Sequence, residues 1–241
     1  MMSTWLRLFT LQASWTDERL QGIGAAFAVE PLLRELSDAS DERYRAALAR
    51  SAGYFNTHPF FAGLALGAIA RAERDGVEMR RVERLRSALK GPLGSLGDRL
   101  IWAGVLPLAS AVGLVLTALG HPVAGIVALL VIFNVAHLAL WLWGLPTGWR
   151  LGTAVAQSLQ NLALQRALAL FGPMAACAVG FALPVVGVHL LTGLSPDVRL
   201  AAMALAGATV IVLRVVYPGF GAARLGTFAA AAALIMGWIW G

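Results

Sequence analysis

Tyr54-Phe55-Asn56-Thr57-His58-Pro59 is the polar stretch around which the rest of the chain is organised. A second stretch, Gly91-Pro92-Leu93-Gly94-Ser95-Leu96-Gly97-Asp98, follows it. Pro59 disfavours the helical conformation at His58, so a helix that arrives from the N-terminal side should end near Asn56. Three glycines and a proline predict a second interruption of the helical pattern in the later stretch. We expect the two interruptions to form a polar site at the edge of, or inside, a membrane domain.

The charged residues lie almost entirely in the first part of the chain. Residues 1–100 carry 26 of the 32 Asp, Glu, Lys and Arg side chains. The chain is 59% hydrophobic and 13% charged, whereas an ordinary soluble domain is about 25% charged. This asymmetry predicts an all-α integral membrane protein, with amphipathic and re-entrant helices in residues 1–99 and about five transmembrane helices in residues 100–241. We place the five spans at about residues 100–119, 123–143, 167–191, 200–217 and 225–240.

Neither the net charge nor the motifs indicate nucleic-acid binding or catalysis. The formal charge is +6, but the basic residues alternate with acidic ones and lie beside apolar segments, which fits the excess of positive charge on the cytoplasmic side of membrane proteins. We therefore expect no nucleic acid and a cytoplasmic N-terminus. The chain has neither a phosphate-binding loop nor a nucleophile elbow, and its four histidines are not spaced as zinc ligands. No catalytic residue, metal or cofactor is expected.

Local signals predict helices on both sides of the first polar stretch. Thr16, or the serine two residues before it, can cap a helix that starts at about residue 17, and Ser40 can cap another. Residues 60–70 are apolar but shorter than the roughly 20 residues needed to cross a bilayer, so we expect a re-entrant or buried half-helix there. Gly63 and Gly67 would let this helix pack closely against a neighbour.

Several polar residues are candidates for ligand contact, and each has a structural alternative. His58 can contact a ligand or only hydrogen-bond the backbone of its turn. Asn56 and Thr57 carry the donor and acceptor groups that a sugar hydroxyl needs, although they can also simply end a helix. Asp98 is the acidic residue beside the first span, where it is either functional or the N-cap of the next helix. Asn134 lies within an apolar span, where it either hydrogen-bonds between helices or lines a pathway.

These motifs resemble those of a known transporter family. Tyr54-Phe55-Asn56-Thr57-His58-Pro59 is similar to the F-F-N-T-H-P signature of the IID subunit of mannose/fructose/sorbose-family phosphotransferase-system permeases. Gly91-Pro92-Leu93-Gly94-Ser95-Leu96-Gly97-Asp98 is similar to the family's G-P-L-(A/S)-G-I-G-D, which a Trp follows, as Trp102 does here. Gln12-Ala13-Ser14-Trp15-Thr16-Asp17-Glu18-Arg19-Leu20-Gln21 is close to its Q-x-x-W-N-Y-E-R-M-Q, and Phe133-Asn134 matches a later F-N.

The resemblance covers about residues 5 to 150 and implies a function. A IID subunit pairs with a IIC subunit in the bacterial cytoplasmic membrane, and together they form the channel that translocates a hexose. A cytoplasmic IIAB protein, or separate IIA and IIB proteins, phosphorylates the sugar, and the IID subunit itself is not phosphorylated. The resemblance also implies an oligomer. The residues it implies for substrate binding are Asn56, Thr57, His58 and Asp98, with Gln12, Trp15, Gln21 and Asn134 as further candidates.

The chain departs from the family pattern at three points. It has Thr16-Asp17 where the family usually has Asn-Tyr, Leu106-Pro107 where Arg-Pro is frequent, and His137 where an Arg follows the second Phe-Asn. These departures leave open a second hypothesis, a non-transporting regulatory or scaffold component of an incomplete phosphotransferase system. A third is an unrelated membrane assembly protein that shares only the helix interruptions. The sequence does not choose between sugars.

Overall fold

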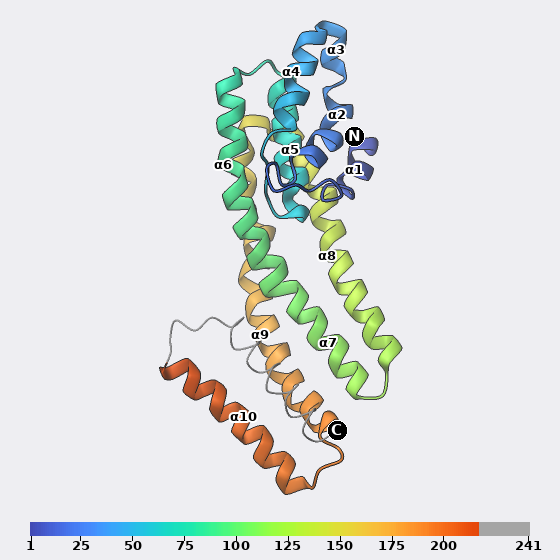
Figure 1. Cartoon of the computed structure of the whole chain (residues 1–241), viewed down its shortest axis with the longest axis vertical. Coiled ribbons are helices and arrows are strands. Elements are labelled where there is room, and N and C mark those ends of the chain that lie inside the picture. Colours follow the sequence, from blue (N-terminus) through green and yellow to red (C-terminus); the bar gives the residue numbers. More distant parts are fainter. Residues whose placement is uncertain (217–241) are drawn as a thin grey trace. The chain divides into compact units, whose positions relative to one another are not determined.

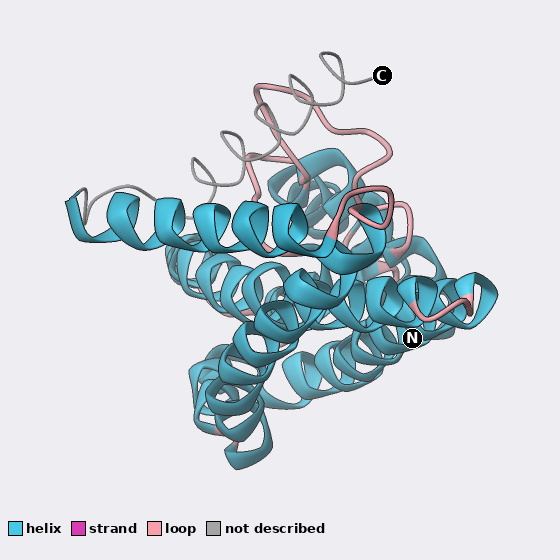
Figure 2. Ribbon diagram, turned by 90° about the horizontal axis from the view of Figure 1, so that it is seen from below, coloured by secondary structure: helices cyan, strands magenta, loops and turns pink. Residues whose placement is uncertain are grey.

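The computed structural model describes residues 1–216, and all the regular secondary structure in this part of the chain is helical (Figure 1). No strand occurs in residues 1–216, where β pairing is confined to two isolated bridges, Thr16–Leu20 and Leu20–Phe55, and Figure 2 accordingly shows only helices and loops. The predicted all-α class is therefore confirmed. The elements are α1 (Met2–Leu8), α2 (Gly22–Leu33), α3 (Glu35–Ala39), α4 (Asp41–Ser51), α5 (Pro59–Arg74), α6 (Met79–Gly97), the π-helical η1 (Asp98–Val105), α7 (Leu106–Ala118), α8 (Pro122–Leu151), the 3₁₀-helical η2 (Gly152–Gln160), α9 (Leu162–Leu190) and α10 (Pro196–Val216).

Helix α5 forms the centre of the core. Thirteen of its sixteen residues are buried, and it contacts α2, α6 and α8. Its Gly63 and Gly67 face a second G-x-x-x-G pair on α8, Gly144 and Gly148. A methyl group at Gly148 would lie only 2.0 Å from the carbonyl oxygen of Leu64, so the two backbones approach as closely as glycine allows. The predicted close packing of α5 is confirmed, although whether α5 re-enters a membrane stays a prediction.

Helices α6, η1 and α7 form one continuous rod of 40 residues, Met79–Ala118 (Figure 1). The predicted interruption at residues 91–98 is therefore wrong. A proline distorts a helix partly because its ring meets the Cβ of the preceding residue, and here that residue is Gly91, which has none. The buried residues Leu89 and Leu93 then hold both sides of the proline against the core. The irregularity appears instead as the π-helical turn that begins at Asp98.

The predicted count of about five membrane spans is not confirmed by the described residues. By length and composition, three helices of the described part can cross a membrane: Met79–Ala118, Pro122–Gln160 and Leu162–Leu190. The fifth predicted span, residues 225–240, lies outside the described residues. The chain forms two compact units, Met1–Ala182 and Leu183–Gly241, and the division predicted at residue 99 falls inside the continuous α6–η1–α7 rod.

Helices α2 and α4, which precede the first polar stretch, are both shorter than the sequence indicated. Helix α2 begins at Gly22 rather than near residue 17, because Thr16 and Leu20 pair through both backbone hydrogen bonds and the hydroxyl of Thr16 caps a turn instead. Helix α4 ends at Ser51 and not near Asn56. The predicted cap at its other end is confirmed, since the Ser40 hydroxyl accepts a hydrogen bond from the Arg43 amide at 3.3 Å.

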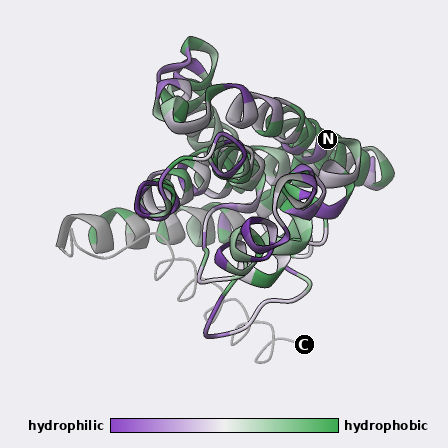
Figure 3. Ribbon diagram, turned by 90° about the horizontal axis from the view of Figure 1, so that it is seen from above, coloured by the Kyte–Doolittle hydropathy of each residue, from purple (hydrophilic) through white to green (hydrophobic). Residues whose placement is uncertain are grey.

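Helix α4 is joined to α5 by an ion pair that involves the buried carboxylate of Glu73. Glu73 accepts two hydrogen bonds from Arg50, at 2.8 and 2.6 Å, and its side chain is 6% exposed. A bidentate pair of this kind joins α4 to α5 with a defined geometry. Figure 3 shows hydrophilic and hydrophobic residues next to each other on the helices near the N-terminus, as expected of an amphipathic region.

Candidate functional site

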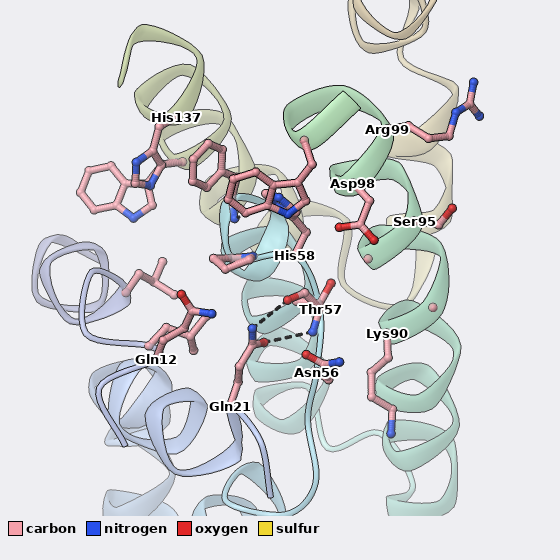
Figure 4. Close-up of a pocket in the computed structure, with 18 of the residues that line it drawn as sticks. Gln12, Gln21, Asn56, Thr57, His58, Lys90, Ser95, Asp98, Arg99 and His137 are labelled. Carbon is pink, nitrogen blue, oxygen red and sulfur yellow. Dashed lines mark hydrogen bonds between the residues drawn. The ribbon is translucent and has the colours of Figure 1, made fainter. Parts of the chain in front are cut away.

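Both sequence motifs line one cavity of about 990 Å³ in the unit formed by residues 1–182. Its walls come from five segments: the end of α1 with the turn after it, the residue before α2, the loop between α4 and α5 with the start of α5, the α6–η1 rod and the middle of α8 (Figure 4). The residues that line it are Leu8, Phe9, Leu11, Gln12, Gln21, Tyr54, Asn56, Thr57, His58, Pro59, Phe60, Lys90, Gly91, Gly94, Ser95, Asp98, Arg99, Trp102, Phe133, His137 and Trp141.

The loop between α4 and α5 is held by a side-chain amide that hydrogen-bonds both backbone groups of one loop residue, as a neighbouring strand would. Gln21, which is 2% exposed, donates to the carbonyl of Thr57 at 2.8 Å and accepts from the Thr57 amide at 3.0 Å (Figure 4). The backbone of Phe55 pairs on either side with Arg19 and Gln21, and its ring is fully buried. Because both neighbours are buried, Asn56 is presented outward into the cavity.

His58 is fixed at the start of α5 and offers one nitrogen to the cavity. Pro59 holds His58 in an extended conformation, so His58 becomes the N-cap of α5, and its Nδ1 accepts from the Phe60 amide at 3.3 Å. The neutral ring must therefore carry its proton on Nε2. Burial lowers the pKa of His58 below its ordinary value near 6.5, against an opposing effect of Asp98 and with a small further lowering by His137. His58 is thus a neutral donor at pH 7.

The cavity contains buried polar atoms that have no partner in the protein. Among the described residues, Nε2 of His58, Oγ1 of Thr57 and Nε1 of Trp141 are buried without a hydrogen bond, and all three residues line the cavity. A buried polar atom left unpaired typically costs about 1–3 kcal/mol. Such a group of unmatched donors and acceptors in a single cavity indicates a polar ligand or water that satisfies them.

Aromatic rings form the rest of the wall. The rings of Phe60 and His137 stack with their centroids 4.0 Å apart and an interplanar angle of 3°. The ring centroids of Phe9 and Trp141 lie 4.4 Å apart. Trp102 is 50% exposed and its ring lies 5.5 Å from that of His58. Aromatic faces next to neutral donors suit a ligand that has both hydroxyl groups and apolar ring carbons.

The charged side chains that line the cavity lie on the α6–η1 rod. Asp98 lies on the side of the rod that faces His58 (Figure 4). Lys90 also lines the cavity, and its ammonium group lies 4.7 Å over the ring of Tyr54. A methyl group at Gly97 would meet the side chain of His58 at 2.2 Å, so the rod and the loop touch there. Within residues 1–216, no three His, Cys, Asp or Glu side chains gather in a way that could hold a metal ion.

The structure brings most, but not all, of the residues predicted from sequence together. Six of the eight line the cavity, whereas two do not. Trp15 is 51% exposed on the loop before α2. Asn134 donates to the carbonyl of Leu130 in its own helix at 2.8 Å, so it neither joins two helices nor lines the cavity. Asp98 is not the N-cap of the next helix, because it is the first residue of η1 and lies within the continuous rod.

Several cavity residues were not among the sequence-based candidates. Tyr54 is the first residue of the first motif, and Lys90 and Arg99 flank the second, so their positions in the sequence are a signal that could have found them. Phe9 and Trp141 reach the cavity only because α1 packs beside α8. No local sequence pattern indicates that contact.

Comparison with known proteins connects this site to a family. Residues 1–199 match the model of the family described as EIID-AGA, PTS system mannose/fructose/sorbose family IID component. The chain belongs to this family. The mannose-specific EIID component of Escherichia coli (strain K12) is 30% identical over 166 residues, which are 67% of this chain and 58% of that protein. The sorbose-specific EIID component of Klebsiella pneumoniae is 29% identical over 171 residues, 69% of this chain and 62% of that protein.

The aligned part of this IID chain thus spans about three fifths of these relatives. A similar chain occurs in a cryo-EM structure of the mannose transporter ManYZ in complex with microcin E492, with 28% identity and a TM-score of 0.58 over 76% of this chain and 68% of that one. A second solved structure, described as a membrane protein, has a TM-score of 0.71 over 96% of this chain and 94% of that one. Its identity is 24%, so it supports the fold of this IID chain and not its activity.

Proposed function

We propose that this IID chain is a membrane subunit of a hexose permease of the phosphotransferase system. In this proposal it forms, with a IIC subunit, the channel that carries the sugar across the bacterial cytoplasmic membrane. A cytoplasmic IIAB protein, or separate IIA and IIB proteins, phosphorylates the sugar. The chain itself positions the sugar and carries no catalytic or phosphorylated residue.

The observation that carries this proposal is the convergence of both family motifs on one cavity with unmatched polar atoms. A pyranose presents hydroxyl groups that both donate and accept, and it has apolar faces. Asn56, Thr57 and Asp98 supply acceptors, while the Nε2–H of His58 and the indole N–H of Trp141 supply donors. Polar groups placed among apolar walls in this way can fix the orientation of the sugar through its hydroxyl groups.

The exposure of the cavity wall supports a IIC subunit as the partner. Asn56, Tyr54 and Trp102 line the cavity and are nevertheless exposed in the single chain. A channel must separate its solute from lipid, so this open side needs a second protein. Charge supports the orientation, because the basic residues of α4 and α6 belong on the cytoplasmic side, together with the N-terminus.

The experiment that tests the proposal is sugar uptake by a strain that makes the chain with its IIC and IIB partners. Wild type is compared with Asn56→Ala and Asp98→Asn at matched membrane levels, using a panel that includes mannose, fructose and sorbose. Asn134→Ala is the matched control, because Asn134 is also a polar residue of a family motif but lies outside the cavity. We expect wild type and the control to accumulate phosphorylated sugar and both cavity variants to lose it.

A complex that assembles but accumulates no sugar of the panel would overturn the transport proposal. The regulatory or scaffold role in an incomplete phosphotransferase system would then be the better account. Equal uptake by wild type and both cavity variants would show instead that the sugar does not pass this cavity.

A further inference from the structure

Arg86 is a buried cation on α6 that lies outside the cavity. Its side chain is 7% exposed, and its guanidinium group donates to three backbone carbonyls. One nitrogen donates to Arg50, and the other donates to Ser51 at 2.9 Å and to Gly53 at 2.7 Å. A buried arginine is ordinarily paired with a carboxylate. The charge of Glu73 acts on Arg86, but the hydrogen bonds of the Arg86 guanidinium group go to backbone carbonyls, and this choice of partners needs an explanation.

The three carbonyls lie where α4 ends and the motif loop begins. The last carbonyls of a helix have no partner within the helix, and they carry the negative end of the helix dipole. Arg86 supplies several donors in a rigid plane, so one side chain satisfies Arg50, Ser51 and Gly53 together. The direction in which the chain leaves α4 is therefore set from α6.

The same guanidinium group also contacts the loop itself. It lies 5.3 Å over the centroid of the Phe55 ring, and Phe55 is fully buried immediately before Asn56. Arg86 thus holds the backbone up to Gly53 and the side chain of Phe55. Only Tyr54 lies between these two points, and it contacts Lys90, one turn further along α6.

We propose that Arg86 is the positioning residue that sets the Asn56–His58 loop against residues 94–98 of the α6–η1 rod. This inference rests on the proposed function for its effect on sugar, though not for its effect on the loop. Arg86 touches no part of the cavity. It lies on the helix that carries the second motif, so it fixes the distance between the two motifs that bind the sugar.

The test compares Arg86→Gln and Arg86→Lys with Arg84→Gln in the full chain within its membrane complex. Arg84 is the matched control, because it is an exposed arginine of the same helix whose side chain bonds only its own helix, at the carbonyl of Arg80. Amide hydrogen exchange by mass spectrometry reports on residues 53–58. The KM and maximal rate of sugar uptake, at matched membrane levels, report on the cavity.

For Arg86→Gln we expect exchange in residues 53–58 to rise about tenfold while α5 and α8 stay protected. The KM should rise about tenfold with the maximal rate nearly unchanged, because the residues that contact the sugar lose their alignment while the rest of the fold stays intact. Arg86→Lys should lie between wild type and Arg86→Gln, since an ammonium group cannot reach three carbonyls with a planar fork. Arg84→Gln should match wild type in both measurements.

Two results would overturn the inference. One is unchanged exchange in residues 53–58, or exchange that rises equally throughout the unit, which would make Arg86 an ordinary stabilising residue. The other is local exchange that rises without any change in KM. If wild type takes up no sugar but the exchange changes as expected, Arg86 does position the loop and the proposed transport function fails instead.

Discussion

Gly97→Ala should separate the two motifs at the point where they touch. A methyl group on Gly97 would lie 2.2 Å from both Cβ and Cγ of His58. Carbon atoms in contact are about 3.5–4.0 Å apart, so the rod or the loop must move by about 1.3–1.8 Å. His58 is 3% exposed and caps α5 next to a proline, so it cannot turn aside without breaking that cap.

The magnitude follows from two opposing effects. Overpacking a buried site costs about 1–3 kcal/mol, while replacing glycine by alanine inside a helix stabilises it by about 1 kcal/mol. Gly94→Ala is the matched control, because Gly94 lies in the same helix and lines the same cavity, but a methyl group there meets nothing within 4 Å. Gly94→Ala should therefore show only the stabilisation of the helix, without the cost of overpacking. The free energies of unfolding of the two variants should differ by about 1–3 kcal/mol.

The assay is thermal unfolding of both variants in detergent, followed by sugar uptake at matched membrane levels. For a chain of this size the free-energy difference corresponds to roughly 2–12 °C in Tm, with Gly97→Ala the lower. Gly97→Ala should also lose uptake that Gly94→Ala retains. Equal Tm and equal uptake for the two variants would refute the close crossing of α6 over His58.

Three further changes test the packing and the titration of the unit. Gln21→Glu removes the donor that holds the motif loop and should lower the free energy of unfolding by about 1–3 kcal/mol, whereas Gln12→Glu, at an exposed side chain, should change it little in the same denaturation assay. Gly148→Ala should lower the Tm, because its methyl group would lie 2.0 Å from a backbone oxygen of α5; Gly180→Ala, which meets nothing within 4 Å, should not. Because burial lowers the pKa of His58, the unfolded chain takes up this proton first as the pH falls, so stability should be constant above the ordinary histidine pKa of about 6.5 and decline below it. His58→Asn keeps a capping side chain without this titration and should flatten that decline in Tm measured between about pH 5 and 7; an equal decline in both proteins would rule out His58 as its source.

The local parts of the fold could be predicted from the sequence. Ser40 caps α4 as expected, and the extended conformation that Pro59 imposes on His58 starts α5. Both glycine pairs, on α5 and on α8, can be read in the sequence, but the contact between them could not be predicted, because helix-to-helix contact is a property of the folded chain. The polar character of the loop around Asn56 was equally visible in the sequence.

The wrong prediction of a helix interruption at the second motif, residues 91–98, has a physical cause. Glycine and proline lower helix propensity by about 1 and 3 kcal/mol, which predicts an interruption when the segment is considered alone. In the fold, Leu89 and Leu93 are buried on either side of Pro92, and tertiary packing outweighs the propensity. Gly97 serves a close approach to His58 rather than a break, and this use of glycine depends on a partner 39 positions earlier in the sequence.

The candidate site was predictable where residues belong to a motif and not where the fold alone joins them. Asn56, Thr57, His58 and Asp98 line the cavity, and they stand out in the sequence as polar residues among apolar ones. The stacking of Phe60 on His137 and the approach of Phe9 to Trp141 join helices that are far apart in the sequence. Trp15 lies outside the cavity although its motif contributes Gln12 and Gln21 to it.

Protection of the cavity by sugar tests the central claim most directly. Ser95→Cys and Trp15→Cys would be made separately in a Cys177→Ser background, which removes the chain's single cysteine, and assembled with the IIC partner. Both positions are exposed in the single chain, but only Ser95 lines the cavity. We predict that a transported hexose slows labelling of Ser95→Cys by a hydrophilic thiol reagent and leaves Trp15→Cys unaffected. Labelling of Ser95→Cys that no transported hexose slows, in a complex that takes up sugar, would contradict the claim that the sugar occupies this cavity.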